Sequence, residues 1–382
     1  MKSLITFLVL LQVVTGAVLA APSNNTAEWY RDAAGVMTWI APDEATIPNN
    51  ADGDKIRDGK KYLTETYKYL GPESRMPYSN TRLSCTNCHM DEGTGAFGAS
   101  WAVVGYKYGG NGRYSARSNR YLTMKNRVHD CMLRSMNGRQ LPDDSYELAA
   151  IIAYMEWLGT GIQAPLTSAD WAKVVGQGNI SVPDIVGRRA DPDNGKIIYE
   201  DKCAACHQSD GSGVWDAKET KYVYPALWGT HSFNNGAGMT RLRTAVGFVK
   251  GNMPYGWANA SDPTRQLSAE DAWDVTAYMI NQDRPIFSGY LTDWSGYSPA
   301  PSNQSINCMP NWMRKFPDAN YEYYFPRVQA NGTLTGDTAE PSKYTADQHR
   351  FGPWAAMLTE QSTLQKNYLN ASTTQVECRT LP

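Results

Sequence analysis

The hydrophobic pattern of the chain shows two matching segments with apolar residues at the three- and four-residue spacing of a helix. Residues 141–158, LPDDSYELAAIIAYMEWL, and residues 267–282, LSAEDAWDVTAYMINQ, each begin with Leu and a polar residue of the kind that caps helices. Each also contains Ala-Tyr-Met near its end. The pattern predicts one amphipathic helix in each segment.

A shorter amphipathic helix is predicted upstream of each segment. Residues 56–70, IRDGKKYLTETYKYL, and residues 191–207, DPDNGKIIYEDKCAACH, share a Gly-Lys step. The repeated order of helices indicates an internal duplication. Residues 166–187 lie in a stretch rich in Gly, Pro and Ser and are expected to link the two repeats. Residues 298–382 have weak periodicity and are expected to form an irregular C-terminal extension.

The N-terminus carries the pattern of an export signal. Residues 1–20 combine the positive charge of Lys2, an apolar run, and the small residues Val18 and Ala20 at the positions of a signal-peptidase site. The run is shorter than a bilayer-spanning helix needs, and polar residues follow it at once. The sequence therefore predicts cleavage near Ala20 and a soluble periplasmic protein without a membrane span.

Composition narrows the possible partners. The 36 Lys and Arg residues balance 38 Asp and Glu, which argues against nucleic acid as a partner. The 23 Tyr and 12 Trp are high numbers for a chain of 382 residues, and they suit a protein that surrounds a large flat cofactor. This length favours two or three domains.

Two pentapeptides carry the strongest chemical signal. CTNCH and CAACH have the C-x-x-C-H spacing of covalent haem c attachment. On one helical turn, two thiols reach the two vinyl groups of a haem while the adjacent histidine reaches its iron. The first motif is Cys85, Cys88 and His89, and the second is Cys203, Cys206 and His207.

Two other interpretations of these motifs explain less. A zinc site gives no reason for a histidine directly after both Cys pairs, and a thioredoxin-like pair would need a strand–helix–strand pattern, which the sequence lacks. The sequence therefore predicts two covalently bound haem c groups. The expected fold class is all-α, with two tandem class I cytochrome c domains over residues 25–165 and 188–297.

Each haem iron is expected to have a second axial ligand downstream of the motif histidine. In the second domain the candidate is Met253, 46 residues after His207, with Met239 and His231 as alternatives. The surrounding sequence NMPYG favours Met253, because Pro and Gly fix a tight, non-helical approach to the iron. His and Met are a standard ligand pair in cytochromes c.

In the first domain the corresponding position is a cysteine. Cys131 lies 42 residues after His89, in the segment VHDCMLRSMNG. Four of the seven cysteines belong to the haem motifs, and Cys308 and Cys378 can form a disulfide in an oxidising compartment. Cys131 is then either an axial ligand or an inert buried thiol, and His129 is a competing ligand.

Basic residues gather around this cysteine. Between residues 107 and 139 there is one acidic residue, Asp130, and there are eight basic residues: Lys107, Arg113, Arg117, Arg120, Lys125, Arg127, Arg134 and Arg139. Most of these side chains are expected to lie on a solvated face. A basic pocket beside a haem would also attract a small dianion and pair with it through forked guanidinium contacts. A pure electron carrier has no need of such a pocket.

Seven segments together resemble the dihaem thiosulfate dehydrogenase family, in order, over about residues 30–295: LSCTNCHMDEGT, RVHDCMLRSMNGRQLP, KCAACHQSDGSG, YVYPALWG, FNNGAGM, NMPYG and AWDVTAYMINQDRP. Members of that family join two thiosulfates into tetrathionate, and some catalyse the reverse reaction. The resemblance implies an enzyme with thiosulfate and tetrathionate as substrate and product. It also implies that an external cytochrome or oxidase accepts the electrons.

The resemblance also implies residue roles. His89 and Cys131 would be the axial ligands of the first, catalytic haem, while the second haem would pass electrons on. Arg117 and Arg127 fall where the family places anion-binding arginines, and Ser135 lies near them in the sequence.

This sequence departs from the family at two places. Some relatives have Lys directly before the Met ligand and exchange the two on reduction, whereas Asn252 precedes Met253 here, so fixed Met ligation is expected. The His129-Asp130 pair before Cys131 also differs from the family pattern. Two alternative functions remain: a non-catalytic dihaem electron carrier, and a sulfur-carrier-loading cytochrome of the thiosulfate-oxidising multienzyme type.

Overall fold

The structure is a computed structural model of the full chain. It describes residues 28–31, 37–102, 104–109, 112–115, 117–118, 120–160, 179–183, 188–289, 308–310, 327–328, 334–335, 346–354, 356, 359 and 376–378. The predicted signal peptide, residues 1–20, lies outside the described residues. Among the described helices, each is too short or too polar to cross a bilayer.

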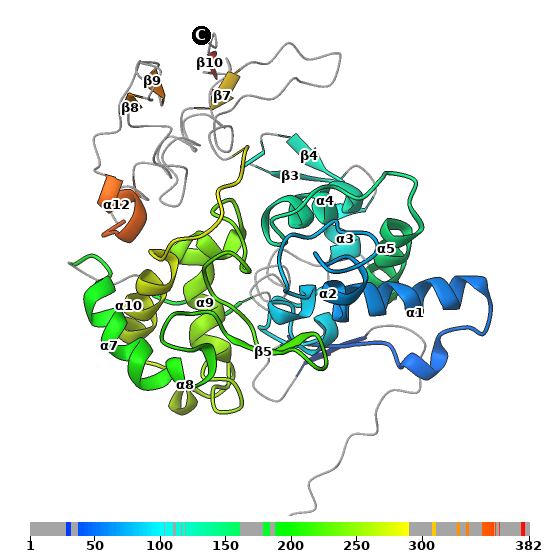
Figure 1. The fold of residues 1–382 in the computed structure, drawn as a ribbon, viewed down its shortest axis with the longest axis horizontal. Helices are drawn as coiled ribbons and strands as arrows, with labels where there is room; N and C mark the ends of the chain where they lie inside the picture. The colour runs from blue at the N-terminus through cyan, green and yellow to red at the C-terminus, as the bar shows by residue number, and fades with distance from the viewer. Residues whose placement is uncertain are drawn as a thin grey trace, which may run out of the picture.

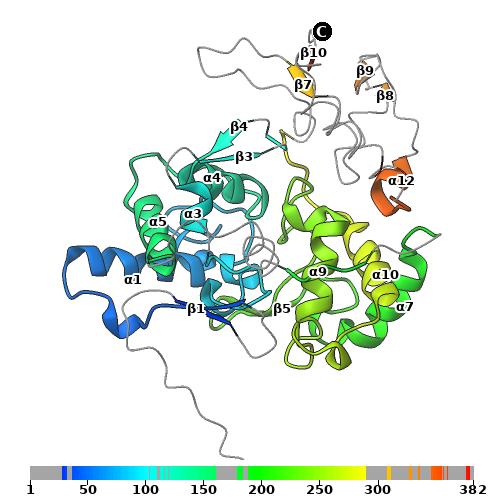
Figure 2. The same cartoon turned by 180° about the vertical axis from the view of Figure 1, so that it is seen from behind.

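Helices dominate the described chain and form two groups that lie side by side (Figures 1 and 2). The N-terminal group contains α1 (Ala51–Thr64), α2 (Thr66–Tyr69), α3 (Val104–Tyr108), α4 (Met124–Arg134) and α5 (Tyr146–Leu158). The C-terminal group contains α7 (Pro192–Lys202), α8 (Ala204–His207), α9 (Leu242–Asn252) and α10 (Ala269–Ile280). Single-turn helices precede or connect these helices: η1 (Glu44–Thr46), η2 (Cys85–Asn87), η3 (Asp91–Gly93), η4 (Gly238–Thr240) and η5 (Pro263–Arg265).

Short strands are also present, so the chain is rich in α-helix rather than purely helical. In the described residues every sheet is an antiparallel pair of strands. The pairs are β1 (Glu28–Arg31) with β2 (Met37–Ile40), β3 (Arg113–Ser115) with β4 (Arg120–Leu122), β5 (Val214–Asp216) with β6 (Lys221–Tyr224), β7 (Cys308–Pro310) with β10 (Val376–Cys378), and β8 (Arg327–Val328) with β9 (Leu334–Thr335). Strands of two to four residues are too short to produce a recognisable alternation of hydrophobic and polar residues in the sequence. A further helix, α12 (Ala346–Phe351), follows β9.

The helices begin where the sequence supplies a side-chain acceptor. Ser145 Oγ accepts a hydrogen bond from the Leu148 N–H at 3.3 Å, and Ser268 Oγ accepts one from the Asp271 N–H at 3.0 Å. These bonds satisfy N–H groups that have no partner inside the helix. Helices α5 and α10 therefore start just after the two serines rather than at the leucines that precede them.

The first and last helices of each group cross at a glycine. A Cβ at Gly59 in α1 would lie 1.9 Å from the carbonyl oxygen of Ala150 in α5. A Cβ at Gly195 in α7 would lie 1.9 Å from the carbonyl oxygen of Asp274 in α10. Only glycine allows two helix backbones to approach this closely. The Gly-Lys step that the two sequence repeats share is therefore a packing requirement.

Each group of helices has its own hydrophobic core, and the two cores touch. Tyr154 is 1% exposed in the first core, and Trp273 is 1% exposed in the second. Phe233 and Ala237 belong to the C-terminal part of the chain but pack into the first core. Met239 packs against both cores. The described halves therefore share a packed interface.

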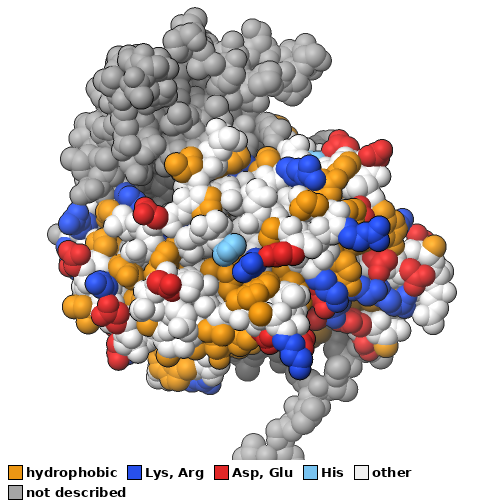
Figure 3. Space-filling model, viewed as in Figure 1, with side chains coloured by type: hydrophobic (Ala, Val, Ile, Leu, Met, Phe, Trp, Pro, Cys, Tyr) orange, Lys and Arg blue, Asp and Glu red, His pale blue; other side chains and the backbone are white. Residues whose placement is uncertain are grey.

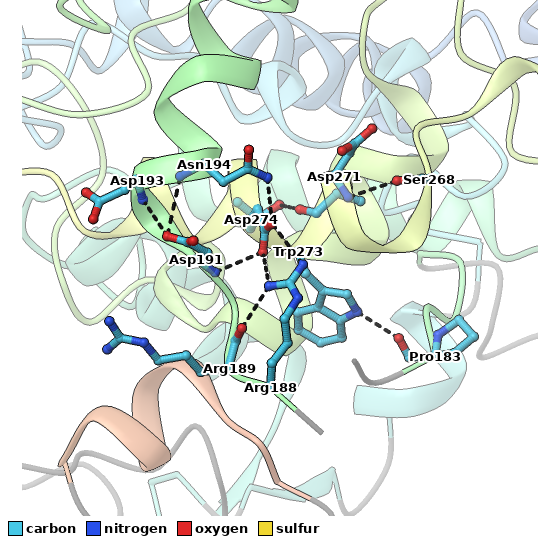
Figure 4. Close-up of polar contacts among 12 residues, drawn as sticks. Pro183, Arg188, Arg189, Asp191, Asp193, Asn194, Ser268, Asp271, Trp273 and Asp274 are labelled. Atoms are coloured by element: carbon cyan, nitrogen blue, oxygen red, sulfur yellow. Dashed lines mark hydrogen bonds and ion pairs between the residues drawn. The ribbon is translucent and has the colours of Figure 1, made fainter. Parts of the chain in front are cut away.

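A buried carboxylate ties the start of α7 to α10 (Figure 4). Asp274, 1% exposed, receives two hydrogen bonds from the Arg188 guanidinium at 2.9 and 3.0 Å. The Asn194 side-chain amide and the Asp191 N–H donate to the same carboxylate at 2.9 and 2.8 Å. A buried charge is stable only when it is paired and hydrogen-bonded, and these four bonds meet that requirement.

Part of the predicted linker packs on the C-terminal half. The Asn179 side-chain amide donates to the Thr244 carbonyl at 3.3 Å, and Trp273 Nε1 donates to the Pro183 carbonyl at 2.7 Å. Residues 179–183 therefore belong structurally with α9 and α10, whereas residues 166–178 and 184–187 lie outside the described residues.

The backbone of the extension brings its two cysteines opposite each other. Strands β7 and β10 pair so that Cys378 faces Cys308. Directly opposed residues in an antiparallel pair have Cα atoms about 4.5 to 5.5 Å apart, which lies within the range that disulfides span. The backbone register therefore supports the predicted disulfide. The side chains of Cys308 and Cys378 lie outside the part of the chain that the structure describes.

We expect Gly195→Ala to destabilise the haem-loaded protein by about 1–3 kcal/mol, because the added methyl group forces α7 away from α10. Gly251→Ala is the matched control. It lies in α9, where the new Cβ would meet its nearest neighbours at an ordinary 3.5 Å. Thermal unfolding of both variants tests the prediction, and equal melting temperatures would contradict it.

We expect Cys308 and Cys378 to be disulfide-bonded in protein isolated from the periplasm. In the chain-entropy model, closing a loop of this length stabilises the fold by about 4 kcal/mol. Mass spectrometry of a non-reduced digest should detect the linked peptide pair, and free thiols at both positions would contradict the pairing.

Candidate haem-binding sites

The first C-x-x-C-H motif forms a tight turn that orients its histidine. The His89 N–H donates to the Cys85 carbonyl at 3.0 Å, which closes one helical turn at η2. His89 Nδ1 lies 2.5 Å from the Ala99 carbonyl oxygen, and its ring lies 4.7 Å from the Trp101 ring, between centroids. Burial lowers the pKa of His89 to about 4. The imidazole is therefore neutral, and Nε2 is left to bind a metal.

The second motif repeats this arrangement in α8. The His207 N–H donates to the Cys203 carbonyl at 2.9 Å, and His207 Nδ1 lies 2.9 Å from the Pro225 carbonyl oxygen. Burial lowers the pKa of His207 as well. Haem-ligating and metal-ligating histidines commonly hold their other ring nitrogen in such a hydrogen bond. Both motifs therefore fit an axial histidine.

A glycine four residues after each motif histidine packs on a tryptophan. A Cβ at Gly93, where φ is +83°, would lie 1.9 Å from the Trp101 ring. A Cβ at Gly211, where φ is +67°, would lie 2.1 Å from the Trp228 ring. The sequence prediction missed these tryptophans and the carbonyls that hold the histidines. The repeated His-x-x-x-Gly spacing is the signal that could have indicated a shared local structure.

The thiols of the motifs sit in a low-dielectric environment. Burial raises the pKa of Cys85 to about 12, and it raises the pKa of Cys88 and of Cys203 to about 11. Among the described side chains, the five cysteines, which include Cys131 and Cys206, form no disulfide. Buried cysteines that are not paired with each other fit the thioether attachment of haem at both motifs.

Helix α4 brings Cys131 to the first motif. The charge of Cys131 contributes to raising the pKa of both Cys85 and Cys88, so its sulfur lies near these thiols. Arg127 lies one turn earlier on α4, on the same face. The charge of Cys131 is the largest cause that raises the pKa of Arg127, and Arg127 also hydrogen-bonds Tyr108 of α3. The structure thus groups Cys131 and Arg127 beside the first motif.

His129 faces a different part of the protein. It is two residues from Cys131, which places the two side chains on opposite sides of α4. His129 Nε2 lies 3.7 Å from Asp143 Oδ1, and burial lowers the pKa of His129. The Leu141 backbone, Lys125 and Asp130 also act on its pKa. These contacts do not bring it to the C-x-x-C thiols.

Arg117, Arg127 and Arg134 near Cys131 are buried or half-buried, whereas Arg113 and Arg139 are exposed, so the solvated face expected from the sequence holds for only part of the basic residues. Asp130, 1% exposed, pairs with Arg117 and with Arg134, each at 2.9 Å. Burial, together with the charges of Arg134, Arg241 and Arg127, lowers the pKa of Arg117 to about 10. Arg241, from the start of α9, was not predicted from the sequence because it lies far along the chain.

The surface view gives a contrast to this buried cluster. Figure 3 shows Lys and Arg side chains interspersed with Asp and Glu on the visible face. That mixture fits the nearly balanced charge of the chain. Arg117, Arg127 and Arg134 are buried or half-buried, and electrostatic interactions are stronger in such an environment than at the surface.

Ser135 and Met253 each lie at the C-terminal end of a helix. The Ser135 N–H donates to the Cys131 carbonyl at the end of α4. Met253 ends α9 and packs, like Cys203, against the C-terminal core. Met239 packs against both cores, whereas His231 is exposed. Met253 is therefore the candidate that belongs to the second motif's core alone.

Comparison with known proteins gives consistent matches. The family model for cytochrome c matches residues 192–283. A thiosulfate dehydrogenase of Allochromatium vinosum is 38% identical over 251 residues, covering 64% of this chain and 84% of the relative. A thiosulfate dehydrogenase of Psychrobacter arcticus is 35% identical over 269 residues, covering 70% of this chain and 75% of the relative.

A solved structure is also similar. The thiosulfate dehydrogenase TsdBA of Marichromatium purpuratum, in its as-isolated form, matches with a TM-score of 0.55 and 28% identity. The match covers 65% of this chain and 50% of that chain, so this chain corresponds to about half of that protein's length. The likeness extends over more of the chain than the cytochrome c model alone.

Proposed function

This chain belongs to the thiosulfate dehydrogenase family, and we propose that it is a periplasmic cytochrome c with two haems that oxidises two thiosulfates to one tetrathionate. Relatives with this name match 64–78% of the chain. Two C-x-x-C-H motifs, two glycine-mediated helix crossings and two histidines held by carbonyls support two tandem cytochrome c domains. Only the second domain is covered by the cytochrome c family model.

The observation that carries the proposal is the grouping of Cys131, Arg127 and the first motif. We propose that His89 Nε2 and Cys131 Sγ bind the first iron, and that His207 and Met253 bind the second. Thiolate ligation favours ferric iron and Met ligation favours ferrous iron. The bound haems then supply one-electron acceptor sites in the order first haem, second haem, and external cytochrome or oxidase.

Cys131 also supplies the sulfur chemistry in this proposal. Its thiolate forms a sulfur–sulfur bond with the terminal sulfur of one thiosulfate, and this step releases two electrons. The terminal sulfur of a second thiosulfate then attacks the thiosulfate-derived sulfur of that bond, as in thiol–disulfide exchange. Tetrathionate leaves, and the Cys131 thiolate is restored. Overall charge and electrons balance, since two dianions give one dianion and two electrons.

The arginines make the approach of two dianions possible. Arg127 lies beside Cys131, and Arg117 belongs to the same buried cluster. Fixed positive charge in a low-dielectric site offsets the repulsion between the substrates. Asp130 holds Arg117 and Arg134 in place through its two ion pairs. Ser135, at the end of α4, is proposed to contact a substrate oxygen.

Ferricyanide reduction with thiosulfate as the sole electron donor tests the function directly. The haem-loaded protein should form one tetrathionate for every two ferricyanide ions reduced. A non-catalytic electron carrier would show no thiosulfate-dependent reduction. A sulfur-carrier-loading cytochrome would need the cysteine of a partner protein before any turnover.

We expect Cys131→Gly to keep both haems and the fold but to lose thiosulfate oxidation, because the axial thiolate and the sulfur nucleophile are removed together. Haem content by absorbance and the ferricyanide assay measure the two effects. His129→Ala is the comparison, and it should retain most activity because its contacts lie towards Asp143. Turnover that survives in Cys131→Gly but is lost in His129→Ala would contradict the assignment.

We expect Met253→Gly to abolish the weak near-infrared sulfur-to-iron band of the ferric protein. Activity with the physiological acceptor should fall more than activity with ferricyanide, since the second haem is the proposed exit for electrons. The matched substitution Met239→Gly should leave the band in place. A band that survives in Met253→Gly and disappears in Met239→Gly would assign the ligand to Met239.

A further inference from the structure

Two asparagines of the C-terminal half hydrogen-bond to the N-terminal half. Asn234, 1% exposed, donates from its side-chain amide to the Leu133 carbonyl at 2.8 Å and from its backbone N–H to the Arg134 carbonyl at 3.2 Å. The Asn252 side-chain amide donates to the Phe97 carbonyl at 3.0 Å. Both pairs join residues that are about 100 or more positions apart, 101 and 155 for the two side-chain bonds.

Asn234 completes the end of α4, the helix that carries Cys131. The last four carbonyl groups of a helix have no N–H donor within that helix and need donors from elsewhere. Leu133 and Arg134 receive theirs from Asn234, whose amide also donates to Asn137 Oδ1 at 3.0 Å. The Arg134 guanidinium lies 4.4 Å from the centroid of the Phe287 ring, again in the C-terminal half.

The position of Cys131 along α4 is therefore set partly from the other half of the protein. Cys131 is only two residues before Leu133, within the same last turn of the helix. Both polar atoms of the Asn234 side chain are hydrogen-bonded, since its Oδ1 also accepts the Gly236 N–H at 3.0 Å. A buried amide with every group satisfied is a rigid contact.

Asn252 makes the corresponding contact on the histidine side. It bonds to Phe97, in the loop whose Ala99 carbonyl holds His89 Nδ1. Phe97 and Ala99 have φ of +61° and +56°, a region that non-glycine residues adopt only when tertiary contacts enforce it. The bond from Asn252 is such a contact. Asn252 also directly precedes Met253 in the chain.

We propose that Asn234 and Asn252 are positioning residues through which the C-terminal half fixes both axial-ligand segments of the first haem centre. Asn252 does so from the residue next to Met253, so it couples the geometry of the two centres. This inference rests on the proposed roles of His89, Cys131 and Met253. A substitution of Asn252 should therefore change the properties of the first haem, although Asn252 does not contact the proposed ligands of that haem, His89 and Cys131.

The hydrogen bond from His89 Nδ1 to the Ala99 carbonyl determines the direction in which the reduction potential of the first haem should change. When Phe97 loses its partner, the strained loop relaxes and the Ala99 carbonyl withdraws from Nδ1. The imidazole then donates less electron density to the iron, so the ferric state is less favoured. Asn252→Ala should shift the reduction equilibrium of the first haem about tenfold towards the ferrous state, which is about 59 mV for one electron.

Haem-loaded Asn252→Ala and Asn234→Ala test the proposal, with Asn281→Ala at the exposed end of α10 as the matched control. The measurements are a redox titration and the paramagnetic resonance signal of the thiolate-ligated ferric haem. We expect the raised potential in Asn252→Ala, an altered thiolate signal in Asn234→Ala, and neither change in the control. The near-infrared band of Met253 should persist in all three.

Two outcomes separate the inference from the function on which it rests. If the wild-type protein shows no thiolate-ligated haem, the ligand assignment itself is wrong. If it shows one, and both asparagine variants keep the wild-type signal and potential, the positioning role is overturned. Asn252 is half-buried, so Asn252→Ala decides the question alone if Asn234→Ala fails to retain haem.

Discussion

One turn of α4, between Arg127 and Cys131, is the constraint on which the candidate site depends. Helical geometry puts a guanidinium and a sulfur four residues apart on one face, and the buried ion pairs of Asp130 fix the neighbouring arginines. The same geometry turns His129 towards Asp143. Asp130 offsets part of the positive charge in this interior, and in the proposed function the arginines also face anionic substrates.

The two halves of the chain share one local arrangement of helices and motif histidine but place different residues opposite the motif. In each, a glycine lets the first helix touch the last, and a carbonyl orients the motif histidine. The halves differ on the opposite side of the motif, where α4 offers a cysteine among arginines and α9 ends at a methionine. This difference divides substrate chemistry from electron exit in the function that we propose.

Local patterns in the sequence predict local features. Helical spacing of apolar residues located α5 and α10, and the C-x-x-C-H spacing located both candidate haem motifs. Such patterns do not predict contacts between residues that are far apart in the sequence. The proximity of Arg241 to Arg117 and the bonds from Asn234 and Asn252 arise only when the two halves pack together. The short strands also left no periodic signal.

A crystal structure of the haem-loaded protein, with the irons located by anomalous scattering, tests the central claim most directly. We expect one iron between His89 Nε2 and Cys131 Sγ, with Arg127 beside the sulfur, and a second iron between His207 and Met253. An iron bound to His89 with His129 or a methionine opposite, and Cys131 away from the metal, would contradict it.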